Sequence, residues 1–187
     1  DAGLNLAAST MGGTFSGTAT TGDITDSGAL AITGAATFIT GATGSNIVLD
    51  TSTNAFSNSV EMRADAGGEV FGNITFVDSA AIDFATGASS NGDFYINAST
   101  DGAVGGNLSV TATTGNITDT VALAVSGTTT LTTSANNATI ALDVATNAFT
   151  GALTITTNDD SGTDADVTID GGTTALIIAA STIDGDL

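Results

Sequence analysis

The sequence is marked first by the residue types that it lacks. Its 187 residues include no cysteine, histidine, proline or tryptophan, and one arginine is the only cationic side chain. The absence of cysteine excludes disulfide scaffolds, thiol catalysis and zinc–thiolate sites. With 20 acidic residues and a net charge of −19, the chain is unsuited to bind nucleic acid or an anionic membrane surface, because both need Lys and Arg. No apolar run is long enough to predict a transmembrane span.

Small and β-branched side chains make up most of what is present. Apolar residues account for 41% of the chain, which is typical of a folded protein and argues against disorder. Only 5% of the residues are aromatic, so the core must be narrow, because a wide core needs large side chains to reach native packing density. A negative charge this high favours solubility and is best screened in a saline medium. We therefore expect an extracellular location at a cell surface.

An internal repeat is the clearest signal in the sequence. Residues 18–26 recur at 111–119 with a single change, which sets an offset of 111 − 18 = 93 residues. The same offset carries Thr-Asn-Ala-Phe at 53–56 onto an identical segment at 146–149. The chain is thus built from tandem units of about this length.

Within the repeat, apolar residues come in pairs separated by one residue, and turn residues separate the pairs. This i, i+2 spacing predicts short β-strands that point two side chains to one face. No segment shows the i, i+3, i+4 spacing of an amphipathic helix, so the sequence predicts an all-β fold. The pairs are Leu30/Ile32, Ile47/Leu49, Val60/Met62, Ile74/Phe76, Ile82/Phe84, Phe94/Ile96 and Leu108/Val110.

Two all-β architectures fit such a repeat: a string of immunoglobulin-like sandwiches, or a right-handed parallel β-helix (β-solenoid). Short strands, small side chains and the absence of proline and tryptophan favour the solenoid. We expect coils of roughly 20 to 25 residues stacked about 4.8 Å apart, with about four coils per unit and about eight in the chain. Phe56 and Phe149 are expected at equivalent corners. In one continuous solenoid we place the end of a preceding unit at 1–17, a first unit at 18–110 and an incomplete second unit at 111–187.

Two segments carry a family resemblance. Residues 106–133, which include the run Gly-Asn-Leu-Ser-Val-Thr-Ala, and residues 26–34, Asp-Ser-Gly-Ala-Leu-Ala-Ile-Thr-Gly, resemble the repeats of giant filamentous-haemagglutinin-like bacterial surface proteins. The resemblance implies a secreted, β-helical fibre that acts in adhesion, biofilm formation or surface coating. We therefore expect a structural segment of an extracellular fibre or adhesin shaft. Its expected partners are neighbouring repeats or identical subunits stacked end to end.

Catalysis has few suitable groups in this sequence. Polysaccharide-cleaving β-helices generally need Lys or Arg, but Arg63 is the only cation, and its counterpart in the second unit is Thr156. Without His, Cys or Lys, acid–base chemistry would rest on carboxylates alone. We expect no enzymatic activity and assign no catalytic or cofactor-binding residue.

One acidic segment is a candidate for calcium. Residues 158–166 carry four aspartates, and calcium prefers clustered hard oxygen ligands. The corresponding segment of the first unit, 65–73, lacks the cluster, which favours a solvated acidic turn. We therefore assign no metal site, and any calcium binding would be local.

Three other functions are alternatives to a purely structural role. Lateral loops around Gly67 or Asp160 differ between the units and would suit an adhesive module that contacts a glycan or host ligand. Threonine patches at 128–130 and 154–156 raise the idea of an ice-binding solenoid, in which T-x-T pairs repeat on one face. Their spacing along the sequence is irregular, however, so β-strand propensity explains them better. A polysaccharide-degrading β-helix is the third alternative.

Overall fold

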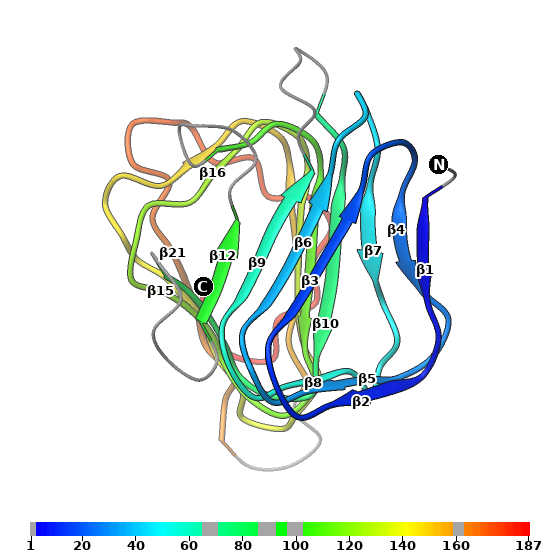
Figure 1. The fold of residues 1–187 in the computed structure, drawn as a ribbon. Coiled ribbons are helices and arrows are strands. Elements are labelled where there is room, and N and C mark those ends of the chain that lie inside the picture. Colours follow the sequence, from blue (N-terminus) through cyan, green and yellow to red (C-terminus); the bar gives the residue numbers. More distant parts are fainter. Residues whose placement is uncertain (1–2, 65–70, 86–92, 97–102, 159–162) are drawn as a thin grey trace.

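The computed structural model describes residues 3–64, 71–85, 93–96, 103–158 and 163–187, with the backbone alone at 93–96 and 103. These residues form an all-β structure in which every paired strand is parallel to its neighbours, and the described part contains no helix. Parallel strands that recur on the same face, joined by short turns, make a β-solenoid (Figure 1). The solenoid, rather than a string of sandwiches, is therefore confirmed.

Two broad sheets, here called sheet A and sheet C, form the long sides of the cross-section. Sheet A has seven strands, in the order β1 (Leu4–Leu6), β4 (Ile24–Asp26), β7 (Ile47–Leu49), β10 (Ile74–Asp78), β14 (Leu108–Ala112), β17 (Thr129–Thr133) and β20 (Leu153–Thr156). Sheet C has eight, in the order β3 (Phe15–Ala19), β6 (Ala36–Thr40), β9 (Val60–Ala64), β12 (Asp93–Ile96), β11 (Ile82–Phe84), β15 (Ile117–Asp119), β18 (Ile140–Leu142) and β21 (Val167–Ile169).

Two narrow sheets close opposite edges of the cross-section (Figure 1). Sheet B lies in the N-terminal half and contains β2 (Ser9–Met11), β5 (Leu30–Ile32) and β8 (Ala55–Phe56). Sheet D lies in the C-terminal half and contains β13 (Ala103–Val104), β16 (Ala124–Val125) and β19 (Ala148–Phe149). Each narrow sheet therefore serves only one half of the rod.

The solenoid is right-handed. In Figure 1, which views the rod from its N-terminal end, the chain runs clockwise as it recedes from the viewer. The seven strands of sheet A define six turns from β1 to β20, fewer than the eight coils expected for the chain. Turn length explains the difference. The step from Leu4 to Ile24 takes 20 residues, whereas the step from Ile74 to Leu108 takes 34.

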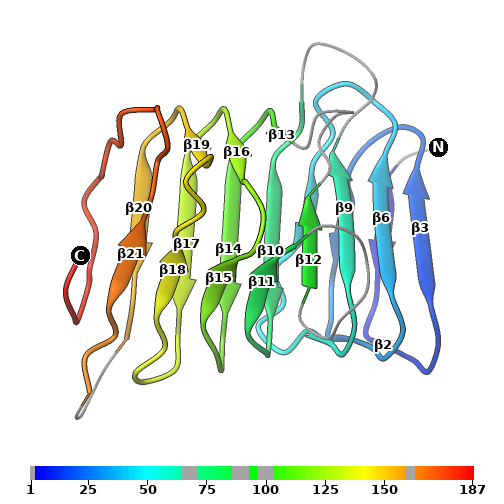
Figure 2. The ribbon, with the colours of Figure 1, turned by 90° about the vertical axis from the view of Figure 1, so that its left-hand side faces the viewer.

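The longest turn contains a strand that lies out of sequence order. Strand β12 follows β11 in the chain but lies between β9 and β11 in sheet C (Figure 2). It pairs with both, and this insertion gives sheet C its eighth strand. The chain then passes through sheet D to β14, where the second half of the rod begins.

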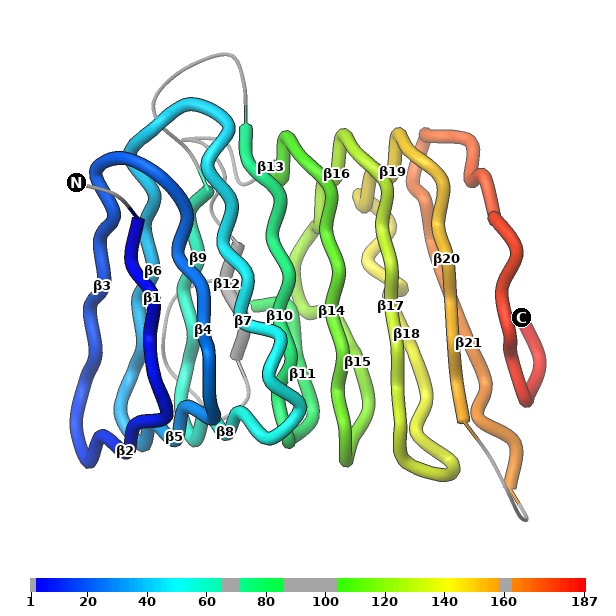
Figure 3. The backbone as a smooth tube through the Cα atoms, turned by 90° about the vertical axis from the view of Figure 1, so that its right-hand side faces the viewer, coloured from blue at the N-terminus to red at the C-terminus, as the bar shows by residue number. Residues whose placement is uncertain are grey.

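The 93-residue offset corresponds to three and a half turns. Three steps of sheet A lead from Ile24 through Ile47 and Ile74 to Leu108, and the chain then crosses to sheet C at Ile117, the counterpart of Ile24. Strands that the first unit contributes to sheet A therefore have their second-unit counterparts in sheet C, and strands that it contributes to sheet C have theirs in sheet A (Figures 2 and 3). Sheet B is likewise replaced by sheet D. The two units are related by a half-turn about the rod axis, a relation that the sequence did not reveal.

One continuous core runs along the axis. The inward residues of the predicted strand pairs are buried wherever the side chains are described, in β5, β7, β9, β10, β11 and β14. Phe56 and Phe149 are buried on the two opposite narrow sheets, so their expected equivalence holds through the half-turn. Phe56 also packs against Phe38 and Phe76, with ring centroids 6.2 Å and 5.2 Å away. The core is narrow and aliphatic, as the low aromatic content predicts.

Candidate functional site

A buried aspartate–asparagine clasp joins successive coils in the second unit. The Asn147 Nδ2 donates to Asp119 Oδ2 at 2.6 Å, and the Asn147 Oδ1 accepts from the Leu123 N–H at 2.8 Å. Asp119 Oδ1 also accepts the Asp143 N–H at 2.9 Å. Asn147 is 1% exposed and Asp119 is 7% exposed. Both side chains are thus fully occupied in holding one coil to the next.

The first unit repeats this clasp at an offset of 93 residues. Asn54 donates to Asp26 at 2.6 Å and accepts the Leu30 N–H at 2.9 Å, while Asp26 also accepts the Asp50 N–H at 3.1 Å. Asn54 is fully buried, but Asp26 is only half-buried. The repeated Thr-Asn-Ala-Phe segment therefore encodes a structural hydrogen-bond network, which the sequence showed only as an unexplained identity.

Two aspartates have perturbed acidity because they are buried. Burial raises the pKa of Asp78, at the end of β10, to about 6, against the opposing effect of backbone N–H groups that include Phe56. Burial also raises the pKa of Asp119, against its hydrogen bond from Asn147. A raised pKa suits a carboxyl for proton transfer, but both groups accept hydrogen bonds from neighbouring coils and face the protein interior. Their chemistry is that of structural acceptors.

A second ladder of polar side chains runs along the edge of sheet A. Each member precedes a strand, and its side-chain oxygen accepts the backbone N–H of the equivalent residue one coil later. The successive distances are 2.8 Å at every step from Asp23 through Asn46, Asn73 and Asn107 to Thr128. The signal was present in the sequence for the four acceptors, because Asp or Asn directly precedes Ile or Leu at their strands, whereas Thr128 precedes Thr129 and ends the ladder as a backbone donor.

The single cation is paired within its own strand. The Arg63 Nε lies 3.1 Å from Glu61 Oε1, and both side chains extend from β9 on the outer face of sheet C. The contact is close enough for an ion pair, although Nε has no aligned hydrogen bond to a described residue. The Arg63 side chain is 40% exposed, so the pair is solvated and worth little stability.

The acidic segment 158–166 is described only in part, because 159–162 lie outside the described residues. Asn158 Nδ2 donates to Ser134 O at 3.0 Å, and Asp166 Oδ1 accepts the Asp186 N–H at 2.9 Å. Across the part of the chain that the structure describes, no three acidic residues gather as a metal site would require. The loop around Gly67 falls outside the described residues, as does Asp160.

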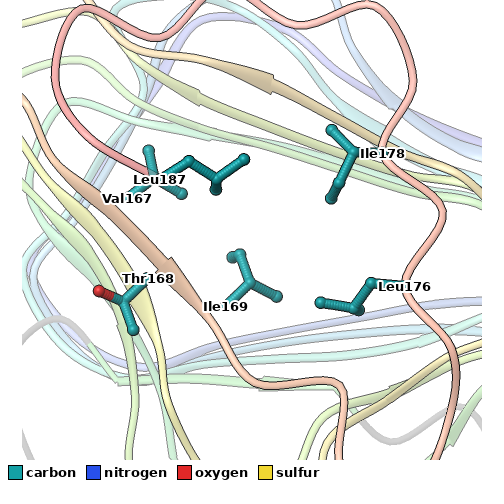
Figure 4. Close-up of a pocket in the computed structure, with 6 residues that line it drawn as sticks. All are labelled: Val167, Thr168, Ile169, Leu176, Ile178 and Leu187. Carbon is teal, nitrogen blue, oxygen red and sulfur yellow. The ribbon is translucent and has the colours of Figure 1, made fainter.

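The C-terminal end of the rod carries an open apolar hollow of about 250 Å³ (Figure 4). Four of its lining side chains, Ile169, Leu176, Ile178 and Leu187, point into the space enclosed by the last coil. Leu187 is 67% exposed, and Ile177, which lies between Leu176 and Ile178 in the sequence, is 55% exposed. The hollow is a continuation of the solenoid core, and its lining consists of five aliphatic residues and Thr168, with no titratable side chain among them.

The threonine patches lie mainly on the outer face of sheet A. Thr130 on β17 and Thr154 and Thr156 on β20 point outward between buried neighbours, whereas Thr128 belongs to the edge ladder and Thr129 faces the core. Thr156 is the counterpart of Arg63, and the half-turn places it on the opposite side of the rod. No helix in the described residues is long and apolar enough to cross a membrane.

Comparisons with known proteins place the chain among repeat proteins. No curated protein and no solved structure matches it. A family model described as repeats of unknown function (DUF5649) matches residues 1–63 and 71–156, which together are most of the chain. Two matches in succession agree with a chain built from repeats. The chain belongs to this family of repeats of unknown function.

Proposed function

We propose that the chain is a structural segment of an extracellular bacterial fibre or adhesin shaft, without catalytic activity. The observation that carries the proposal is the continuous construction of the rod. Its coils share one hydrophobic core, and neighbouring coils are joined by sheet hydrogen bonds and by side-chain ladders. Such a rod should resist bending because each coil is joined to the next through both broad sheets and, in each half, through one narrow sheet.

The polar side chains support a mechanical role over a chemical one. The most deeply buried carboxyl and amide groups, those of Asp78, Asp119, Asn54 and Asn147, act as inter-coil hydrogen-bond partners. Asp26 does the same from a half-buried position, and exposed acids such as Asp164 keep a long surface soluble. The resemblance of residues 106–133 to filamentous-haemagglutinin-like repeats supports the extracellular, surface-exposed setting.

End-to-end contact with a neighbouring repeat or an identical subunit is part of this proposal. Leu176, Ile177, Ile178 and Leu187 expose apolar surface at one end of the core, and the half-buried Leu4, Leu6, Met11 and Phe15 lie at the other. A coil stacked on either end would extend both broad sheets and cover these side chains. The energetic gain is the burial of apolar area, at about 25 cal/mol per Å².

Immunogold electron microscopy of the source cells tests the proposal. An antibody raised against the purified chain should label thin fibres outside intact cells, and protease treatment of intact cells should remove the label. Label that appears only after permeabilisation would contradict the extracellular role. A glycan array provides the test of the adhesive alternative: binding that is lost when residues 65–70 and 159–162 are exchanged would assign the function to the lateral loops instead.

A further inference from the structure

Seven hydroxyl side chains form a regular array on the outer face of sheet A, the face that Figure 3 presents. They lie in two rows on β10, β14, β17 and β20. The first row aligns Thr75, Ser109, Thr130 and Thr154, and the second aligns Thr111, Thr132 and Thr156, with Val77 at its start. We call these seven residues the hydroxyl array.

The strand register gives the array a constant spacing. Neighbouring strands lie about 4.8 Å apart, and residues i and i+2 of one parallel strand lie about 6.6 Å apart. Within the first row, the sequence intervals from Thr75 to Ser109, Thr130 and Thr154 are unequal because the loops between the strands differ in length. Neighbouring strands nevertheless pair residue for residue, so each row stays aligned. The irregular sequence spacing, which argued against an ordered threonine face, thus reflects turns of different length and does not disturb the alignment of the strands.

The array is uncharged on a strongly acidic protein. None of its seven residues is ionisable, although the chain carries 20 acidic residues. The opposite broad face, in contrast, presents Glu61, Arg63 and Asp83 among its outward residues. The array also contains no aromatic ring on which a sugar could stack and no cation for a phosphate. Its chemistry therefore selects a neutral, hydrogen-bonding partner.

Within the described part of the chain, the array hydroxyls are not used for side-chain hydrogen bonds. None of them makes a side-chain hydrogen bond to another residue that the structure describes. Threonine is stiff about χ1, so the strand backbone fixes where each methyl and hydroxyl group points. Each is flanked by inward residues such as Val110, Leu131 and Ile155, which are completely buried and hold the sheet rigid. A partner would thus meet a preorganised surface and lose little affinity to protein ordering.

We propose that the hydroxyl array binds ice. The surface of an ice crystal is neutral, donates and accepts hydrogen bonds, and repeats in two dimensions at spacings close to those of the array. Single hydroxyl–water contacts are weak, but a rigid sheet adds many of them in parallel without further ordering cost. This activity goes beyond the proposed structural role and is independent of it, because a rod that does not bind ice could still form a fibre shaft.

Ice-affinity partitioning tests the proposal directly. A dilute solution of the purified chain is frozen slowly from a cooled probe, and the protein is measured in the ice and in the remaining liquid. We expect the chain to be enriched in the ice. Thr132→Tyr, at the centre of the array, should lower this enrichment roughly tenfold, because its ring stands above the plane and separates the flat face from the crystal. Tyrosine keeps a high strand propensity, so the coil should fold.

Thr37→Tyr is the matched control, because Thr37 is half-buried on β6 of the opposite broad sheet. It should partition as the unchanged chain does, and circular dichroism should show the same sheet content for all three proteins. Exclusion of the unchanged chain from the ice would overturn the proposal, as would equal enrichment of Thr132→Tyr. Light scattering that finds a dimer which Thr132→Tyr dissociates would assign the array to self-association instead.

Discussion

The aspartate–asparagine clasp makes a quantitative prediction about Asn147. Substitution by alanine removes the partner of the Leu123 N–H and of Asp119 Oδ2, both of which are buried. Each buried polar group left without a partner costs about 1–3 kcal/mol, so Asn147→Ala should lower the free energy of unfolding by about 2–5 kcal/mol. Urea denaturation followed by circular dichroism measures this loss, and hydrogen exchange at the Leu123 amide should accelerate with it.

Asn54→Ala is the matched comparison, because Asn54 occupies the same position in the first unit. Its removal leaves the buried Leu30 N–H without its acceptor, but the half-buried Asp26 carboxylate can accept a hydrogen bond from water instead. We therefore expect a smaller loss, of about 1–3 kcal/mol. A loss below about 0.5 kcal/mol for Asn147→Ala, or a larger one for Asn54→Ala, would refute the view that burial of the acceptor sets the strength of the clasp.

Three further predictions concern single positions. Burial raises the pKa of Asp78 from 3.8 to about 6, so the stability that its protonated carboxyl contributes should be complete below pH 3.8 and lost as the pH rises through about 6. The free energy of unfolding should change by on the order of 2–3 kcal/mol over this range. Urea titrations at several pH values measure the change, and Asp78→Asn should abolish it. Gly127→Ala should lower the thermal midpoint clearly, since its methyl group would lie 2.5 Å from Gly106 O, whereas Gly12→Ala, which faces open space, should leave it unchanged. Thr129→Val should raise the free energy of unfolding by about 1 kcal/mol, because the buried Thr129 hydroxyl has no partner among the described residues; an unchanged or lower value would mean that the hydroxyl is satisfied.

The fold was predictable because its signal is local. A strand of three to five residues needs only an apolar pair such as Ile47/Leu49, and the turns between pairs are marked by Gly, Asn and Asp. The number of turns was overestimated because turn length varies, and nothing near Phe94 indicated that β12 inserts between strands that precede it in the chain. Composition alone could not supply this long-range order.

The side-chain networks were harder to predict, because their partners lie one coil apart. Asn147 and Asp119 are 28 residues apart, and only the register of the coils brings them together. The threonine patches at 128–130 and 154–156 were noticed, but their alignment was not, since Thr132 and Thr156 become neighbours only when the intervening turn is folded. The identity of residues 53–56 and 146–149 did signal a shared constraint, but the sequence could not say which hydrogen bonds imposed it.

The half-integral repeat determines how a longer array of such units would display its surface. Consecutive units show their corresponding residues on opposite flanks, and the same flank returns only after two units, or seven turns, which is about 34 Å along the axis. A given position of the repeat thus faces one flank in odd units and the other flank in even units, although every unit contributes strands to both flanks. Sequence divergence between alternate units would give the fibre two chemically distinct sides on an unchanged backbone, as the threonine face and the charged face of this chain already show.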